Sequence, residues 1–190
     1  MRAILLWCLA GALSCSGGGS PAEPVVSLRG ESADPSGDGG VADLVFASFE
    51  VIGSNIRVRA ELSPDTFHRD SILVEFDLDT DENAATGYTT PNPGHVGIGI
   101  DCLIELGKVA PANLGVRVRR FEAGSFVSTV VAAATPLTNG YEATVPLSGC
   151  ADDGRALLRV GSFRQVGNLG GTTVRQDWLP DPPGVPIAVR

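Results

Sequence analysis

The sequence has little of the chemistry on which several large classes of protein depend. Its 14 lysines and arginines stand against 22 aspartates and glutamates, which gives a formal net charge of −8. Without a basic surplus to neutralise phosphates, the chain is not expected to bind nucleic acid or to dock on anionic lipid through charge. An acidic surface instead favours cations as small partners.

Familiar catalytic motifs are also missing. The sequence contains no G-x-S-x-G, no H-E-x-x-H and no glycine-rich strand-to-helix phosphate loop. Its two histidines, His68 and His95, are expected to be solvated surface groups, and the initiator is the only methionine. We therefore expect neither a haem nor a zinc site. The chain is predicted not to be an enzyme, with a hydrolase acting through aspartate or glutamate as the alternative.

The N-terminus lacks an apolar run long enough to span a bilayer. MRAILLWCLAGALSC has one basic residue and a short apolar core, Ile4–Leu13, which is typical of an export signal. Its last five residues, GALSC, resemble the bacterial lipobox, with Ala12 where leucine is usual, which implies cleavage before Cys15 and lipidation of its thiol. Ser16 resembles the next residue of lipoproteins sorted to an outer membrane. An ordinary secretory signal, cut a few residues later, is the alternative.

Three regions follow from this composition. Residues 1–15 are the predicted signal, which ends in the lipidated cysteine. Residues 16–40 are rich in glycine, serine, proline and acidic residues and read as a flexible tether. Residues 41–190 are long enough to form one domain with its own core. The predicted location is therefore extracytoplasmic, at the outer membrane or cell surface, with the lipid anchor holding the protein to the membrane.

Helical periodicity is absent, and a period of two runs through most of residues 41–190. In Ile56–Leu62, for example, four apolar residues alternate with Arg57, Arg59 and Glu61. A series of short strands separated by turn signals predicts an all-β fold, an antiparallel two-sheet sandwich resembling a jelly roll. The expected strands are Val41–Ile52, Ile56–Leu62, Ser71–Leu78, His95–Leu106, Val116–Phe121, Phe126–Ala133, Tyr141–Leu147, Ala156–Phe163, Thr172–Trp178 and Val185–Val189.

Four cysteines are present, and two of them remain in the predicted mature domain. Cys8 leaves with the signal and Cys15 carries the lipid, so Cys102 and Cys150 form an even pair in an exported chain. Such a pair predicts a disulfide. Two buried free thiols are the alternative.

Hard oxygen ligands crowd the stretch DLDTDENAATGYTTPNPGHVGIGID, from Asp77 to Asp101. Ca²⁺ prefers such ligands, and several carboxylates within one turn repel each other without a cation. If the flanking strands pair as a hairpin, Asp101 approaches the turn from its polar side. The predicted ligands are Asp79, Asp81, Asn83 and Asp101. Asp77 is left outside this set because, as a strand residue, it can simply face solvent.

This loop does not satisfy the EF-hand pattern. Counting from Asp77, the sixth position is Glu82, where glycine makes the turn, and the twelfth is Tyr88, where a bidentate glutamate is needed. A solvated hairpin loop, in which aspartate and asparagine cap their own backbone, is the alternative to a metal site.

The run FDLDTDENAATGY, followed by GIGID, resembles a bacterial secreted module. In it a strand leads into D-x-D-x-N-x-x-T-G and the next strand carries G-x-D. Such modules resemble the β-sandwiches of the family 9 carbohydrate-binding and DOMON-like group, and the closing QDWLPD (Gln176–Asp181) is similar to an ending seen there. The resemblance covers residues 41–190 and implies a calcium-supported sandwich, commonly a non-catalytic appendage.

Aromatic residues are scarce, at 6% of the chain. Sugar binding uses exposed ring faces, and Trp178 and Tyr88 are the candidates for such a platform, with packing roles as the alternative. Tyr141 alternates with Ala143 and Val145 and is expected in the core.

These features together predict a lipid-anchored, non-catalytic module, stabilised by Ca²⁺, that has a binding or structural role at the cell surface. A glycan or an envelope protein is its expected partner. A carbohydrate-binding module using Trp178 and Tyr88, or a secreted hydrolase, is the alternative.

Overall fold

A computed structural model describes residues 25–38, 40–91, 95–109, 114–150, 153–165 and 173–190. The predicted signal with Cys15, and the first part of the predicted tether, lie outside these residues. Within the described ranges, no helix has the length and apolar character that a membrane crossing requires.

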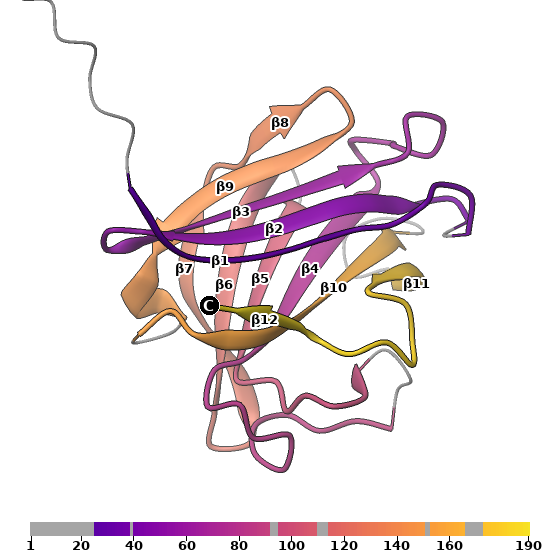
Figure 1. Cartoon of the computed structure of the whole chain (residues 1–190). Helices are drawn as coiled ribbons and strands as arrows, with labels where there is room; N and C mark the ends of the chain where they lie inside the picture. Colours follow the sequence, from indigo (N-terminus) through magenta and orange to yellow (C-terminus); the bar gives the residue numbers. More distant parts are fainter. Residues whose placement is uncertain (1–24, 39, 92–94, 110–113, 151–152, 166–172) are drawn as a thin grey trace, which may run out of the picture.

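Two antiparallel sheets pack against each other (Figure 1). The first has five strands, in the order β1 (Val26–Ala33), β2 (Leu44–Ile52), β3 (Asn55–Leu62), β9 (Gly140–Pro146) and β8 (Thr135–Leu137). The second has the order β11 (Thr173–Leu179), β10 (Ala156–Gln165), β4 (Ile72–Asp79), β5 (Cys102–Lys108), β6 (Leu114–Glu122) and β7 (Ser125–Ala132), and β12 (Ile187–Val189) also pairs with β10. The predicted all-β, two-sheet sandwich is confirmed.

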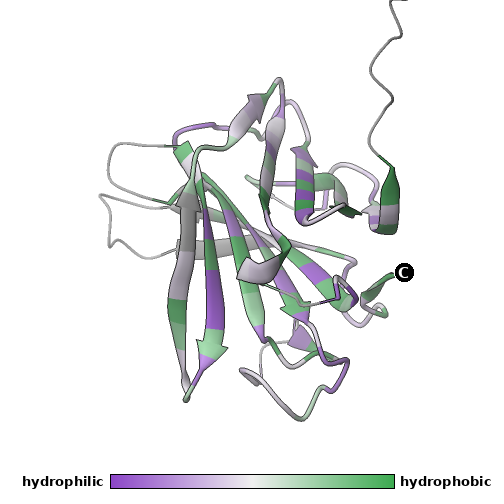
Figure 2. Cartoon of the chain, turned by 90° about the vertical axis from the view of Figure 1, so that its left-hand side faces the viewer, coloured by the Kyte–Doolittle hydropathy of each residue, from purple (hydrophilic) through white to green (hydrophobic). Residues whose placement is uncertain are grey.

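The core lies between the two sheets, where the apolar residues of the alternating strands meet. Hydrophobic and hydrophilic bands alternate along several strands (Figure 2). In β3 the predicted alternation holds, because Ile56, Val58, Ala60 and Leu62 are all buried. Tyr141 of β9 is fully buried, as expected, and its hydroxyl donates a hydrogen bond to the carbonyl of Arg69 at 2.7 Å.

The predicted disulfide between Cys102 and Cys150 is confirmed. Cys102 opens β5, and Cys150 follows the short 3-10 turn η2 (Leu147–Gly149). Their Cα atoms lie 5.6 Å apart, and both residues belong to the main core cluster.

The predicted tether extends too far into the chain. Residues 26–33 form β1, which pairs with β2 along its length. Its backbone also meets the C-terminal end of the chain, where the N–H of Arg29 donates to the carbonyl of Arg190 at 2.9 Å. The segment was misread because β1 is an edge strand with mostly exposed side chains, so its sequence shows little apolar alternation.

The predicted strand His95–Leu106 is also too long, because β5 begins only at Cys102. Val96, which lies within the predicted strand, is 53% exposed. Ile98 and Ile100 are buried, but they join a small separate cluster with Leu103 instead of the main core. The glycines between these residues let the chain depart from strand geometry before β5.

We predict that removing the disulfide in a Cys102→Ala/Cys150→Ala variant lowers the free energy of unfolding by about 4 kcal/mol, because the bond closes a long loop in the unfolded chain. The sequence separation of 48 residues sets this magnitude. Urea unfolding of the variant and the oxidised wild type measures the difference, and equal unfolding free energies would contradict it.

Candidate metal centre

The register of the β4–β5 hairpin brings two acidic residues together. Leu78 pairs with Cys102 in the last step of the ladder, and the N–H of Asp101 donates to the carbonyl of Leu78 at 2.8 Å. Asp79 follows Leu78 and Asp101 precedes Cys102, so the two aspartates come next to each other at this end of the hairpin. The loop between the strands folds back over this end of the hairpin, and an isolated bridge between Tyr88 and Ile100 holds it there.

Asp79 is fully buried at the base of the loop. Its two carboxylate oxygens accept hydrogen bonds from backbone N–H groups, Oδ1 from Asn83 at 2.9 Å and Oδ2 from Gly99 at 3.1 Å. Burial raises the pKa of Asp79, these two N–H groups lower it, and the neighbouring Asp81 and Asp101 raise it further. The described protein groups therefore compensate the negative charge of Asp79 only in part.

Asp81 and Asp101 approach Asp79 from two sides. Asp81 Oδ2 lies 2.8 Å from the hydroxyl of Thr86, and Asp101 Oδ2 accepts the backbone N–H of Thr80 at 2.9 Å. One carboxylate oxygen from each of the three aspartates lies within 4.8 Å of the others. The structure thus brings together three of the four predicted ligands.

Asn83, the fourth predicted ligand, takes part through its backbone. Its N–H donates to both Asp79 and Asp81, at 2.9 and 3.0 Å. Its side-chain Oδ1 instead accepts the N–H of Ala85 at 3.2 Å, which closes a local turn. Asn83 therefore positions the carboxylates in this structure, and its amide oxygen points back to its own loop.

Two glycines allow the loop to close over Asp101. Gly87 has φ +67°, and a Cβ there would lie 2.7 Å from Asp101 Oδ1. A Cβ on Gly99 would lie 1.9 Å from the carbonyl oxygen of Thr86, a distance that no side chain can occupy. The segment that approaches Gly99 so closely is the loop after β4.

The loop takes a left-handed turn at its sixth position without glycine. Glu82 has φ +56°, in the left-handed region that usually requires glycine. An ion pair to the last residue holds its side chain, with Arg190 Nη1 2.6 Å from Glu82 Oε1. At this position a glutamate thus adopts the left-handed conformation that glycine commonly supplies.

A second acidic group lies beside the loop, where a buried aspartate pairs with a histidine. Asp77 is fully buried, and His95 Nε2 lies 2.9 Å from its Oδ2. The expectation that Asp77 faces solvent is therefore wrong, as is the expectation that His95 is a solvated surface group. Both are covered because the outer face of the second sheet lies under the loops that follow β4 and β11.

Arg159 of β10 supplies positive charge to this buried group. It is fully buried, and its guanidinium donates to the carbonyls of Val96 at 2.9 Å, Pro180 at 3.0 Å and Gly184. Burial lowers the pKa of Arg159, and the charge of Asp77 raises it. Although the side chains of Glu75, Asp77 and His95 come close enough to share a metal, the guanidinium opposes a further cation there.

The two aromatic residues proposed as a sugar platform lie in different environments. Trp178 is 8% exposed and packs edge-on against the ring of His95, 5.0 Å between centroids. Tyr88 is 41% exposed and forms an aromatic cluster with Phe121 and Phe126. The packing role that the sequence left open for Trp178 is the one found, so the expected pair of exposed ring faces is not present.

A third acidic group surrounds Asp177 of β11, which is 6% exposed. Its carboxylate accepts the N–H of Leu44 at 2.6 Å and that of Trp178 at 2.7 Å, so both of its oxygens bind backbone of the sandwich. Burial raises the pKa of Asp177 to about 6, the two N–H groups oppose this, and the charges of Asp38 and Asp181 add to the rise.

The chain was compared with known proteins in three ways. Neither a scan against protein-family models, nor a search of curated proteins, nor a search of solved structures finds a match for this chain.

We predict that the raised pKa of Asp177 makes its contribution to stability fall as pH rises. The folded state keeps the proton up to about pH 6, whereas the unfolded chain releases it near the ordinary value of 3.8. The stability that Asp177 adds is therefore complete below about pH 4 and is lost as pH passes 6, by about 3 kcal/mol in total.

The measurement is urea unfolding between pH 4 and about 7, in the presence of a chelator, for wild type and Asp177→Asn. The difference in unfolding free energy between the two should shrink with rising pH. Asp65→Asn, at an exposed aspartate, is the matched control. A pH-independent difference for Asp177→Asn would refute the assignment.

Proposed function

We propose that the chain is a lipid-anchored, extracytoplasmic, non-catalytic β-sandwich module in which the loop after β4 binds a structural calcium ion. The observation that carries the calcium site is the convergence of Asp79, Asp81 and Asp101 within 4.8 Å, with Asp79 fully buried. The resemblance of D-x-D-x-N-x-x-T-G to the calcium-supported secreted modules agrees with this proposal.

Repulsion among the three carboxylates is the physical reason for a cation. Two unit charges 4.8 Å apart repel by about 3–4 kcal/mol at an effective dielectric constant of about 20. Two backbone N–H groups offset part of this at Asp79, and Thr80 and Thr86 offset part of it at the other two. A divalent ion held by the three aspartates removes the remaining repulsion.

The chemistry of the donors favours Ca²⁺ over other divalent ions. All the candidate side-chain donors are carboxylate oxygens, which suit calcium and magnesium and do not suit softer metals. Because Mg²⁺ demands near-ideal octahedral geometry, three carboxylates on an irregular loop fit the more tolerant shell of Ca²⁺. Loop carbonyls and water complete that shell.

We expect that Ca²⁺ raises the melting temperature of the full-length protein and that chelation lowers it. For the weak affinities of extracellular modules, millimolar Ca²⁺ adds about 0.4–1.4 kcal/mol, which corresponds to a rise of about 1–5 °C. Calorimetry with and without Ca²⁺ measures the shift, and Mg²⁺ at the same concentration should give a smaller one.

Variants locate the effect. Asp81→Asn and Asp101→Asn should each abolish most of the calcium-dependent shift, because each removes a negative ligand. Asp153→Asn, the same substitution in the turn before β10, should keep it. A wild-type melting temperature that does not change between chelator and 5 mM Ca²⁺, about the upper extracellular range, would rule out the calcium site.

Attachment to the membrane is tested separately. We expect wild type to partition with membranes and to incorporate labelled palmitate, because two or more acyl chains give stable anchoring. Cys15→Ser should abolish the label and release the protein, whereas the matched Cys8→Ser variant, altered within the signal, should keep both. Release of an unlabelled wild-type protein would instead support an ordinary secretory signal.

A further inference from the structure

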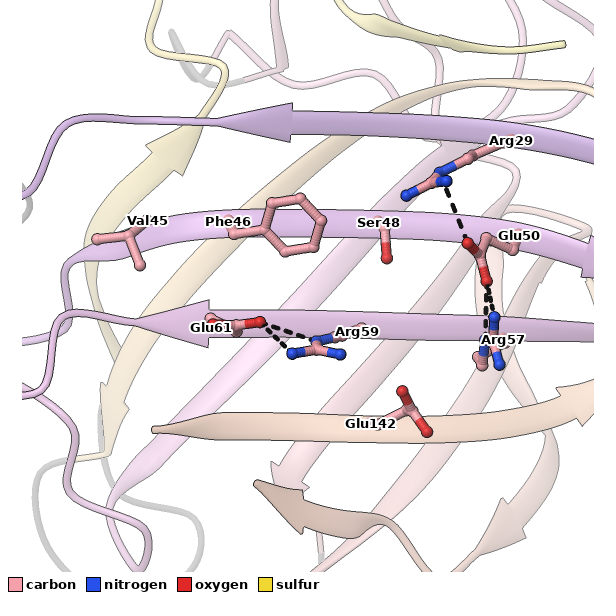
Figure 3. A pocket seen from close by; sticks show the side chains of 9 residues that line it. All are labelled: Arg29, Val45, Phe46, Ser48, Glu50, Arg57, Arg59, Glu61 and Glu142. Carbon is pink, nitrogen blue, oxygen red and sulfur yellow. Dashed lines mark hydrogen bonds and ion pairs between the residues drawn. The ribbon is translucent and has the colours of Figure 1, made fainter. Parts of the chain in front are cut away.

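The outer face of the five-stranded sheet carries a polar groove that the calcium site does not use. Its hollow has a volume of about 620 Å³ and runs across β1, β2, β3 and β9 (Figure 3). Sites for small molecules commonly have volumes of about 300–1,000 Å³. The groove is open along one side, so a ligand would lie along the sheet and would not be enclosed.

The register of the sheet explains why the hollow lies at its centre. Successive outward side chains stand in rows across the strands, and one row runs through Glu31, Ser48, Arg59 and Glu142. Ser48 is the smallest of these and is 6% exposed, so it forms the floor between longer neighbours. The adjacent rows place Glu50 on one side of this floor and Phe46 on the other (Figure 3).

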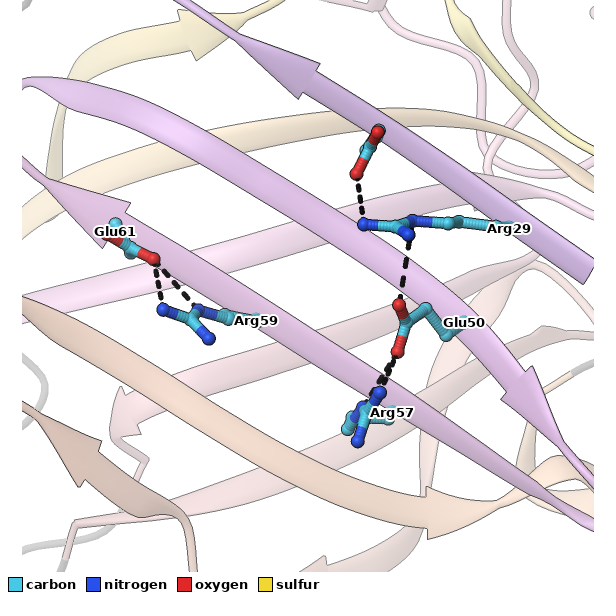
Figure 4. Close-up of polar contacts among 6 residues, drawn as sticks. Arg29, Glu50, Arg57, Arg59 and Glu61 are labelled. Carbon is cyan, nitrogen blue, oxygen red and sulfur yellow. Dashed lines mark hydrogen bonds and ion pairs between the residues drawn. The ribbon is translucent and has the colours of Figure 1, made fainter. Parts of the chain in front are cut away.

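Ion pairs hold the long side chains of the walls in place (Figure 4). Glu50, which is 7% exposed, lies between two guanidinium groups: Arg29 Nε is 3.5 Å from its Oε1, and Arg57 Nε is 2.8 Å from its Oε2. Arg59 is paired in the same way with Glu61, Nε to Oε1 at 2.8 Å. A ligand would therefore meet guanidinium groups that are already oriented, which reduces the entropy cost of binding.

These arginines keep donors for a ligand. Arg57 and Arg59 each bind their glutamate through Nε and Nη2. Because a guanidinium has five N–H donors in a fixed fork, the Nη1 side of each remains for a partner outside the described hydrogen bonds. Glu142 adds carboxylate acceptors opposite Arg59 on the neighbouring strand.

Charge balance decides which class of ligand fits. The lining contains three arginines and three glutamates, so the groove has no net charge although the chain is strongly acidic. A charged ligand would meet groups of its own sign wherever it lay, which costs several kcal/mol at close range. A neutral ligand with many hydroxyls meets no such penalty, because each hydroxyl both donates and accepts.

We propose that this groove binds a neutral glycan. Pairs of adjacent sugar hydroxyls match the two-pronged geometry of a guanidinium or a carboxylate. The ring of Phe46 faces the groove and offers an apolar surface to the C–H face of a sugar (Figure 3). The inference goes beyond the proposed function, since it adds a ligand-binding site that is separate from the calcium loop, and it places sugar binding away from Trp178 and Tyr88.

The test is affinity electrophoresis of the full-length protein in gels that contain one polysaccharide each. Neutral probes (a β-glucan, a xyloglucan, a galactomannan and an arabinogalactan-free galactan) are compared with anionic polygalacturonate and cationic chitosan. We expect at least one neutral probe to retard the protein, and neither charged probe to do so.

Variants assign the binding to the groove. Ser48→Trp fills its floor and should weaken binding by at least about tenfold, and Glu142→Gln should weaken it as well. Thr144→Trp is the matched control, because Thr144 is exposed on the same face but does not line the hollow. Melting temperatures are measured for each variant, and Glu142→Gln preserves the test if Ser48→Trp does not fold.

Retardation by charged probes alone, or equal binding by wild type, Ser48→Trp and Glu142→Gln, would overturn the groove assignment, as would no binding to any neutral probe. The calcium-dependent melting shift is recorded on the same samples. A retained shift without glycan binding refutes the groove alone, and glycan binding without a shift refutes the calcium site alone.

Discussion

Three carboxylates repel one another at the end of the β4–β5 hairpin, and this repulsion is the main constraint on the loop that joins the two strands. Backbone pairing fixes Asp79 and Asp101 side by side, so they cannot separate without losing the register of the second sheet. The loop then brings Asp81 to them and seals the group through contacts at Gly87 and Gly99. A cation would relieve this repulsion, which is why we propose that the loop binds calcium.

The two sheets use their outer faces differently. Part of the outer face of the second sheet is covered by loops, where buried Asp77 lies beside His95 and close to the charge of Arg159. Asp177 lies on the opposite face of this sheet and accepts hydrogen bonds from two backbone N–H groups, one of them from β2. The outer face of the first sheet stays open and carries oriented ion pairs around a hollow. This open face is the one for which we propose glycan binding.

Much of this could be predicted from the sequence, because alternation of side chains reports which strands bury one face. The sandwich, most strand positions and the grouping of Asp79, Asp81 and Asp101 follow from this alternation. The disulfide follows from the even number of cysteines in the predicted mature domain. The errors share a cause. Each depends on which distant segment covers a face of a sheet, and a local sequence pattern does not encode that. This holds for β1, for the segment before β5 and for the burial of Asp77, His95 and Trp178. The groove was missed because its rows exist only after four strands align.

The most direct test of the central claim is a crystal structure of the protein grown with Ca²⁺, with anomalous data to identify the ion. If the loop binds calcium, the map contains one calcium peak bound by carboxylate oxygens of Asp79, Asp81 and Asp101 at about 2.3–2.6 Å. The calcium site would be contradicted by these three side chains turned apart, bonded only to water and backbone N–H groups, in crystals that contain millimolar Ca²⁺.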